Sequence, residues 1–324
     1  MLKSYDYIEY SEDNTSIQDT GFFNKELEIA HSFINKGVRP TKQGSIPSCL
    51  CKGEMLPFFE KWGIPYYRCN NCGCVTAAVE EEEVEAFNKE TDLNDYRRSV
   101  QYQKNAEEKR ELSWEELIDW IRFRTYRYLG EKRASIIDCG NRYEGLVQKI
   151  KKSPFCKEYR LMNSILCEEE GGQGSAFKGD VLLHLNNLQR SINPVKDLET
   201  VGRELRNGGL LFLSTRIGTG FDTLCLREHS KVFPYEHIYL PSIRSLEIAV
   251  ERAGYRVLEV STPGRLDAIY VKNNIENIFS GEYFVRHLMK HADMETLQEF
   301  QRFLQRSNMS SYVQIVAQKL EDRN

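Results

Sequence analysis

The pattern of apolar and polar positions in the second half of the chain switches repeatedly between the spacing of strands and that of helices. Apolar runs of strand length predict strands at 133–140, 158–166, 180–185, 209–215, 255–264 and 311–319. Apolar residues three or four apart predict helices at 143–152, 193–207, 242–254 and 294–307. Strands separated by helices of about 10–15 residues predict a doubly wound parallel sheet with helices on both faces.

Glycine and proline mark the expected ends of several helices. Pro194 can open the helix at 193–207, because its fixed φ suits the first helical turn, and Gly208 can close it. A long helical pattern at 105–129 stops at Gly130 for the same reason.

The first half of the chain is organised differently. An amphipathic helix is expected at 21–37, and the acidic run at 79–87 is interpreted as a solvated helix face. The chain therefore divides into an N-terminal helical extension (1–45), a cysteine module with its linker (46–104) and an α/β domain (105–324).

Composition narrows the classes of protein that fit. Hydrophobic residues make up 40% and aromatic residues 11% of 324 residues, which indicates a folded protein. The net charge of −4 includes no dominating basic block, so a nucleic-acid partner is disfavoured. The sequence contains no apolar run of the roughly 20 residues that a membrane helix needs, and the polar N-terminus does not fit a signal peptide. We expect a cytoplasmic protein without a membrane partner.

Five of the nine cysteines lie close together in the sequence, between residues 49 and 74. Cys49 and Cys51 form one pair, and Cys69 and Cys72 form a second pair, with seventeen residues between the two pairs. Two close thiolate pairs can enclose a tetrahedral zinc ion, which would be structural because four thiolates leave no open position. Cys74 is then a spare thiol. The alternative is a set of reduced, buried cysteines without metal.

A turn after the first strand of the predicted sheet could bind a nucleotide-like cofactor. In an open parallel sheet, ligands bind beyond the carboxyl ends of the strands, and Asp138 and Gly140 lie there. Gly140 permits a close approach of the backbone to a ligand. Asn163 takes the place at the end of the second strand where an acidic residue commonly binds ribose.

The segments 179–224, 233–268 and 303–319 together resemble the class I S-adenosylmethionine-dependent methyltransferases. The first contains a strand beginning with aspartate, an Asn-Pro helix start and a Gly-Gly turn. The second resembles one branch of that family, which has a TPG-x-LD signature and often an N-terminal zinc ribbon. The resemblance covers about 46–320 and implies a Rossmann-like fold of the class I methyltransferase type. It departs at the cofactor loop, where Arg142 and Glu144 replace two glycines.

By position, the resemblance implies a set of cofactor contacts. The residues that would face the methionine, ribose and sulfonium parts of S-adenosylmethionine are Asp138, Gly140, Asn141, Asn163, His184, Asn186 and Asn187. Two of them have structural alternatives, because Asp138 could cap the following helix and His184 could be an ordinary buried histidine.

Methyl transfer to a hydroxyl or an acidic carbon requires a base, and Glu236-His237 is the candidate pair. A carboxylate beside an imidazole can orient it and raise its basicity. His229, preceded by Glu228, is the second candidate for a catalytic group. The alternative is that these are surface histidines.

Three functions follow from this reading. The first is a methyltransferase acting on a small polar biosynthetic intermediate, such as a sugar nucleotide, a substrate class that comes from the resemblance alone. The second is a catalytically inactive, methyltransferase-like binding or scaffold protein, which the altered loop suggests. The third is an enzyme that modifies nucleic acid, which the net negative charge of the chain disfavours.

Overall fold

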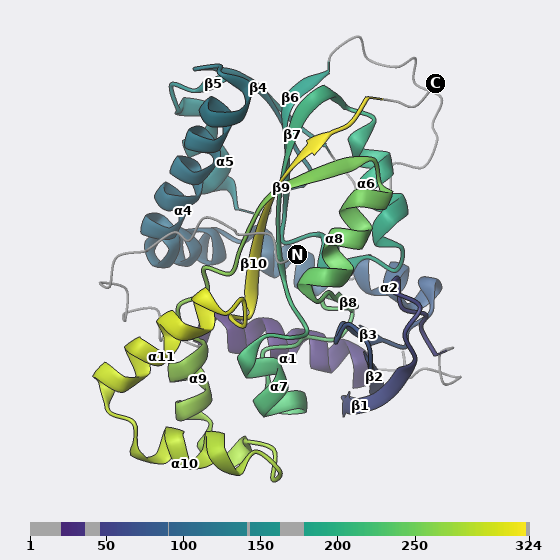
Figure 1. Cartoon of the computed structure of the whole chain (residues 1–324), viewed down its shortest axis with the longest axis vertical. Coiled ribbons are helices and arrows are strands. Elements are labelled where there is room, and N and C mark those ends of the chain that lie inside the picture. Colours follow the sequence, from purple (N-terminus) through teal and green to yellow (C-terminus); the bar gives the residue numbers. More distant parts are fainter. Residues whose placement is uncertain (1–20, 36–45, 90, 141–142, 163–177, 322–324) are drawn as a thin grey trace.

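The computed structural model describes residues 21–35, 46–89, 91–140, 143–162 and 178–321, and its centre is a six-stranded sheet (Figure 1). The strand order is β5-β4-β6-β7-β10-β9. The strands are β4 (Ala134–Asp138), β5 (Cys156–Leu161), β6 (Gly179–Leu185), β7 (Leu205–Arg216), β9 (Tyr255–Ser261) and β10 (Tyr312–Lys319). The first four are parallel to one another, whereas β10 runs antiparallel to both β7 and β9. This confirms the expected α/β class with a Rossmann-like, mostly parallel sheet.

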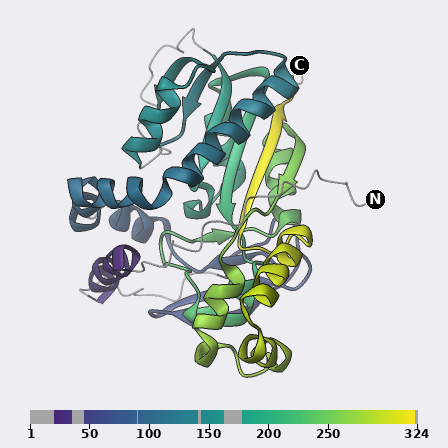
Figure 2. The ribbon, with the colours of Figure 1, turned by 90° about the vertical axis from the view of Figure 1, so that its left-hand side faces the viewer.

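Helices cover both faces of the six-stranded sheet, as Figure 1 shows. One face packs against α4 (Val100–Leu129) and α5 (Glu144–Lys152), whose buried residues include Trp114, Trp120 and Ile150. The other face packs against α6 (Pro194–Gly202) and α8 (Ile243–Arg252). Figure 2 shows α4 crossing its face of the sheet. None of the helices in the described ranges is long and apolar enough to cross a membrane.

A second, four-stranded antiparallel sheet contains the cysteine module. Its order is β1 (Met55–Lys61), β2 (Ile64–Cys69), β3 (Val75–Ala77) and β8 (Tyr239–Leu240). The last of these strands comes from the second half of the chain, and Val75 pairs with Leu240. The module therefore shares its sheet with the segment that follows β7.

The helices of the first hundred residues pack against this second sheet and form a separate hydrophobic core with it. They are α1 (Gly21–Asn35), α2 (Glu81–Asn88) and α3 (Thr91–Arg98). Ala30 and Ile34 of α1 share a hydrophobic cluster with Tyr66 and with Phe233 of the later segment. The acidic run is a helix as expected, and its apolar residues Val84 and Phe87 are buried.

Four further helices lie near the carboxyl ends of the parallel strands (Figure 1). They are α7 (Phe221–Leu226), α9 (Asp267–Asn273), α10 (Tyr283–His291) and α11 (Met294–Arg306), with short 3-10 turns η1 (Leu188–Arg190), η2 (Arg227–His229) and η3 (Ile275–Asn277). Only α11 was expected from the hydrophobic pattern. Together α7, α9, α10 and α11 form a separate cluster of buried side chains, which includes Phe221, Val271, Met289 and Leu304.

Two helix boundaries differ clearly from the sequence prediction, and one of them is the start of α4, which lies at Val100 rather than at residue 105. The helix expected at 193–207 ends at Gly202, and β7 already begins at Leu205. Leu205 is fully buried, and a Cβ at Gly202 would collide with the hydroxyl of Tyr255. Gly208, which was expected to close this helix, lies inside β7 instead, with a φ of 75°. By contrast, Gly130 ends α4 as expected, with a left-handed φ of 69°.

Candidate functional site

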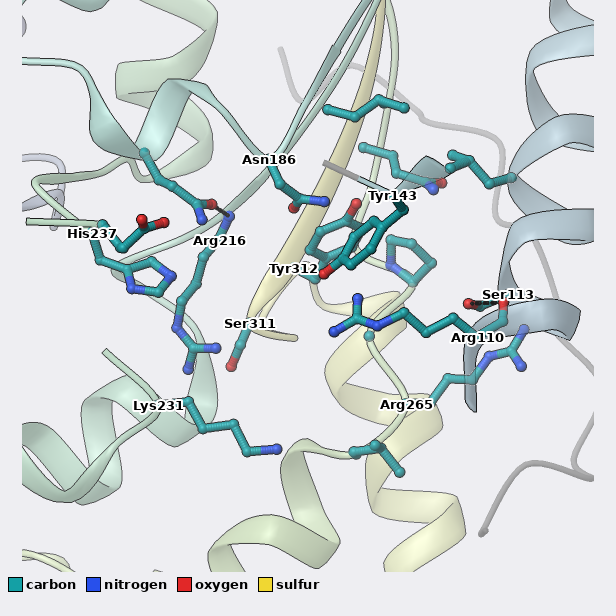
Figure 3. A pocket seen from close by; sticks show the side chains of 18 of the residues that line it. Arg110, Ser113, Tyr143, Asn186, Arg216, Lys231, His237, Arg265, Ser311 and Tyr312 are labelled. Carbon is teal, nitrogen blue, oxygen red and sulfur yellow. Dashed lines mark hydrogen bonds between the residues drawn. The ribbon is translucent and has the colours of Figure 1, made fainter. Parts of the chain in front are cut away.

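A cavity of about 490 Å³ lies at the carboxyl edge of the parallel strands. Its wall combines the ends of β4, β6 and β7 with α4, the loop around Lys231 and the segment from Pro263 to Asp267. Figure 3 shows side chains from these elements pointing into one space. The cavity is therefore at the place where open parallel sheets bind their ligands.

The turn after β4 supplies part of the wall. Gly140 lines the cavity and has a φ of +86°, which an L side chain rarely adopts. The preceding Asp138 is buried, and its Oδ2 accepts a hydrogen bond from the Tyr159 hydroxyl at 2.7 Å. Asp138 is not the N-cap of α5, which is Tyr143. Gly140 is thus placed as the sequence predicts, whereas the Asp138 carboxylate bonds to the neighbouring strand. The expected contacts Asn141, Arg142 and Asn163 lie outside the described residues.

The residues after β6 also reach the cavity. Asn186 and Asn187 both line it, and Asn186 has a left-handed φ of 57°. The Asn187 Nδ2 donates to the Cys139 carbonyl at 2.6 Å, which ties this turn to the turn after β4. Two cofactor candidates from different strands, Gly140 and Asn186, therefore lie on one wall.

His184 has a different position from the one expected. It lies inside β6, is completely buried and is not part of the cavity wall. Burial lowers its pKa to about 4, so the imidazole is neutral at physiological pH. Neither ring nitrogen has a hydrogen-bond partner among the residues that the structure describes. The structure therefore places His184 in the core rather than beside a bound cofactor.

Aromatic side chains occupy the side of the cavity next to the altered loop. Tyr143 stacks with Tyr102, with ring centroids 6.5 Å apart, and lies 5.8 Å from Trp114. The Arg110 guanidinium lies 4.8 Å from the centre of the Tyr143 ring. Tyr143, which follows Arg142 in the altered loop, thus packs against residues of α4 while lining the cavity.

The candidate pair Glu236-His237 lies at the cavity, but each residue has other partners. The Glu236 carboxylate accepts a hydrogen bond from Arg97 Nη1 at 2.8 Å, and its other oxygen lies 2.6 Å from Arg190 Nη2. The His237 Nδ1 accepts the Phe233 backbone N–H at 2.9 Å. A neutral imidazole whose Nδ1 accepts a hydrogen bond carries its proton on Nε2. The pair therefore does not have the geometry of a carboxylate that orients a base through Nδ1.

The second candidate, His229, lies in η2 and is not part of the cavity wall. Its side chain is about half exposed, and its Nε2 lies 3.7 Å from a Glu228 oxygen. This is the surface histidine of the alternative interpretation.

The sequence reasoning missed several charged residues of the site. The wall includes Arg110, Arg216, Lys231 and Arg265. Arg265 pairs with Glu116 of α4 at 2.6 Å. One signal was available in the sequence, because Arg216 directly follows the apolar run of β7 and therefore lies at the ligand-binding edge of the sheet.

The cysteine module brings its thiols together as predicted. The ligand atoms of Cys49, Cys51, Cys69 and Cys72 all lie within 4.8 Å of one another. Neighbouring sulfurs in this group are 3.3–3.4 Å apart. Such a cluster permits a metal ion, because four sulfurs at about 2.3 Å from a tetrahedral zinc would be nearly this close together. Cys74 adjoins the group, with its sulfur 3.3 Å from that of Cys49.

Comparison with known proteins gives one curated relative at the level of sequence. The tRNA U34 carboxymethyltransferase of Campylobacter hominis is 25% identical over 166 residues, which cover 45% of this chain and 58% of the relative. The chain thus spans little more than half the length of the curated relative that it matches. No protein-family model matches the chain.

Solved structures resemble the chain only weakly. The plantazolicin methyltransferase BpumL in complex with SAH has a TM-score of 0.42 at 13% identity, with 74% of this chain and 94% of that chain covered. Phosphoethanolamine N-methyltransferase 2 of Haemonchus contortus has a TM-score of 0.35 at 15% identity, with 60% and 51% covered. The [4+2]-cyclase SpnF has a TM-score of 0.33 at 10% identity, with 62% and 80% covered. Structural similarity at this level does not identify the reaction that the chain catalyses, because proteins of one fold catalyse different reactions.

Proposed function

We propose that this protein is an S-adenosylmethionine-dependent methyltransferase whose cofactor binds beside Gly140 and Asn186. The observation that carries the proposal is the cavity at the carboxyl edge of β4 and β6, with Gly140 at +86° in its wall. The curated relative is named a carboxymethyltransferase, so its name also describes the transfer of an alkyl group. When bound, the cofactor supplies an activated methyl group on a sulfonium.

The residues present fit such a cofactor in two respects. A Cβ at Gly140 would meet no atom closer than 3.9 Å, so the backbone there borders open space. Asn186 and Asn187 offer amide groups on the same wall, and amides can both donate and accept hydrogen bonds. The chain's own contribution is to bind and orient the cofactor and the acceptor, because a sulfonium already carries a good leaving group.

The alternative of an inactive scaffold is tested by cofactor binding. We expect S-adenosylhomocysteine to bind to the purified protein in calorimetry and to raise its melting temperature. Gly140→Ala should weaken this binding about tenfold, because the added methyl group obstructs the close backbone approach. Gly130→Ala is the matched control, since Gly130 also has a positive φ but lies at the end of α4. No heat and no thermal shift at millimolar ligand would favour the scaffold.

The acceptor is proposed to be a small polar molecule that enters the cavity from the side of Lys231. A sugar nucleotide is one candidate, which rests on the sequence resemblance alone. Nucleic acid stays an alternative acceptor, because the curated relative is named for tRNA, so the expectation of no nucleic-acid partner is not supported.

The cysteine cluster is proposed to hold one structural zinc ion through Cys49, Cys51, Cys69 and Cys72. Their arrangement within 4.8 Å supports a four-thiolate site. Such an ion would join the segment before β1 to the turn between β2 and β3.

A further inference from the structure

Three cationic side chains converge on the part of the cavity beside Ser311. Arg110 comes from α4, Arg216 from the end of β7 and Lys231 from the loop after η2. Figure 3 shows their charged ends pointing from three sides into the space beside Ser311.

Carboxylates do not fully neutralise these three cations within the described part of the chain. Lys231 contacts the ring of Tyr270 at 4.3 Å, and Arg110 contacts the ring of Tyr143 at 4.8 Å. Neither forms an ion pair with a described residue. Arg216 bonds to Asp222 through Nη2, but its Nε is buried without an acceptor among the described residues. Donors are therefore available to a ligand from more than one side.

The two nearby acids are held by other groups of the protein. Asp222 accepts hydrogen bonds from Ser311 and Thr223 as well as from Arg216. Asp267 accepts from Gln301 Nε2 at 2.9 Å and from the Ser311 backbone N–H at 3.2 Å. Burial, and then the charge of Arg216, lower the pKa of Lys231 below that of an ordinary lysine. The charges of Asp222 and Asp267 oppose this lowering of the Lys231 pKa only in part.

We propose that this part of the cavity binds the phosphate group of a small acceptor molecule through Arg216, Lys231 and Arg110. This inference rests on the proposed function, because it describes the molecule that would receive the methyl group. A phosphate monoester carries up to two negative charges and three acceptor oxygens, which match several donors from different directions. Guanidinium groups suit phosphate oxygens because their N–H donors form a fixed fork.

The position of the cations favours a small molecule over a nucleic-acid backbone. They line a cavity of about 490 Å³, the size range of small-molecule sites. Nucleic acid is usually contacted by a basic stripe on the surface, and the net charge of the chain is −4.

The test measures thermal stabilisation by inorganic phosphate at constant ionic strength, with sodium chloride and sodium acetate as reference salts. We expect phosphate to raise the melting temperature of the wild type more than either reference salt. In Lys231→Met, about tenfold more phosphate should be needed for the same shift, and Lys231→Arg should restore most of the response. Lys104→Met is the matched control, because Lys104 is 67% exposed on α4 and pairs with Glu108. General salting effects of phosphate act equally on all variants, so the difference between variants reports the site.

Two outcomes would overturn the inference. One is a phosphate response that is the same in Lys231→Met and the wild type. The other is binding of a short single-stranded RNA that depends on Lys231 while inorganic phosphate shows no such dependence. S-adenosylhomocysteine binding is measured on the same proteins. If Lys231→Met still binds this ligand, its phosphate response tests the anion site independently of the proposed function. If the wild type does not bind S-adenosylhomocysteine, the proposed function is rejected.

Discussion

Arg97 Nη1 lies 2.8 Å from Glu236 Oε1, although the two residues are 139 positions apart in the sequence. Arg97 Nε also bonds to Glu26 of α1 at 2.8 Å, and Arg190 of η1 approaches the other oxygen of Glu236. This buried network joins the N-terminal helices to the loop that carries His237. Glu236, which the sequence offered as part of a catalytic pair, therefore has a structural role in the wall of the cavity.

Removing the charge of Glu236 should destabilise the fold. We expect Glu236→Gln to lower the free energy of unfolding by about 3 kcal/mol, because two partly buried guanidinium groups lose the buried carboxylate that they share. Glu85→Gln is the control, since Glu85 is 44% exposed and pairs only along its own helix with Lys89, where the expected loss is about 0.5 kcal/mol or less. Urea unfolding measures both. Equal stability of Glu236→Gln and the wild type would contradict the structural role.

His237 is expected to anchor the substrate, with its Nε2–H as the donor. His237→Ala should raise KM by about tenfold or more, as for the loss of one hydrogen bond to a charged group. His237→Gln, whose amide nitrogen can take a position similar to Nε2, should retain most of the affinity. Initial rates with an acceptor found by screening phosphorylated metabolites measure this effect. A fall in kcat by about 10²–10⁴ with an altered pH profile would instead identify His237 as a general base.

The cysteine cluster should contain one metal ion per chain. Elemental analysis of protein purified without added metal should give about one equivalent of zinc, and Cys69→Ser should lose it and melt at a lower temperature. Cys74→Ser should keep the metal if the four proposed ligands are correct. Cys156→Ser is a control for loss of a buried thiol elsewhere, because Cys156 lies in β5. A metal-free protein of full stability would exclude the site.

The stability of the protein should depend on the titration of Lys61. Burial, and then the charge of Arg216, lower the pKa of Lys61 to about 8 from 10.5, so the folded state disfavours its charged form. Between these two values the unfolded chain binds more protons than the folded one, and stability from this group rises with pH. Relative to Lys61→Met, the wild type should therefore gain about 2 kcal/mol between pH 7.5 and 9.5 in urea unfolding. A pH-independent difference would show that the folded pKa of Lys61 is close to 10.5.

The sequence by itself determined the central sheet and the cysteine cluster. Continuous apolar runs predict buried parallel strands, because both faces of such strands lose contact with water. Short spacing keeps the two thiols of each pair close together, and two such pairs are typical of a four-thiolate zinc site, so Cys49, Cys51, Cys69 and Cys72 could be grouped in advance. Gly140 and Asn186 were placed correctly because each follows a strand of that sheet.

The tertiary structure decided which side chains point into the cavity. His184 lies within β6 and is completely buried, whereas Asn186 follows the end of β6 with a left-handed φ of 57° and lines the cavity. Arg97 and Glu236 meet only because α3 packs against a loop far away in the sequence. Arg110, Arg216 and Lys231 likewise come from separate elements, and no local pattern records that they converge. Local periodicity reports the burial of a segment, whereas ion pairs and ligand sites depend on contacts between segments that only the folded chain brings together.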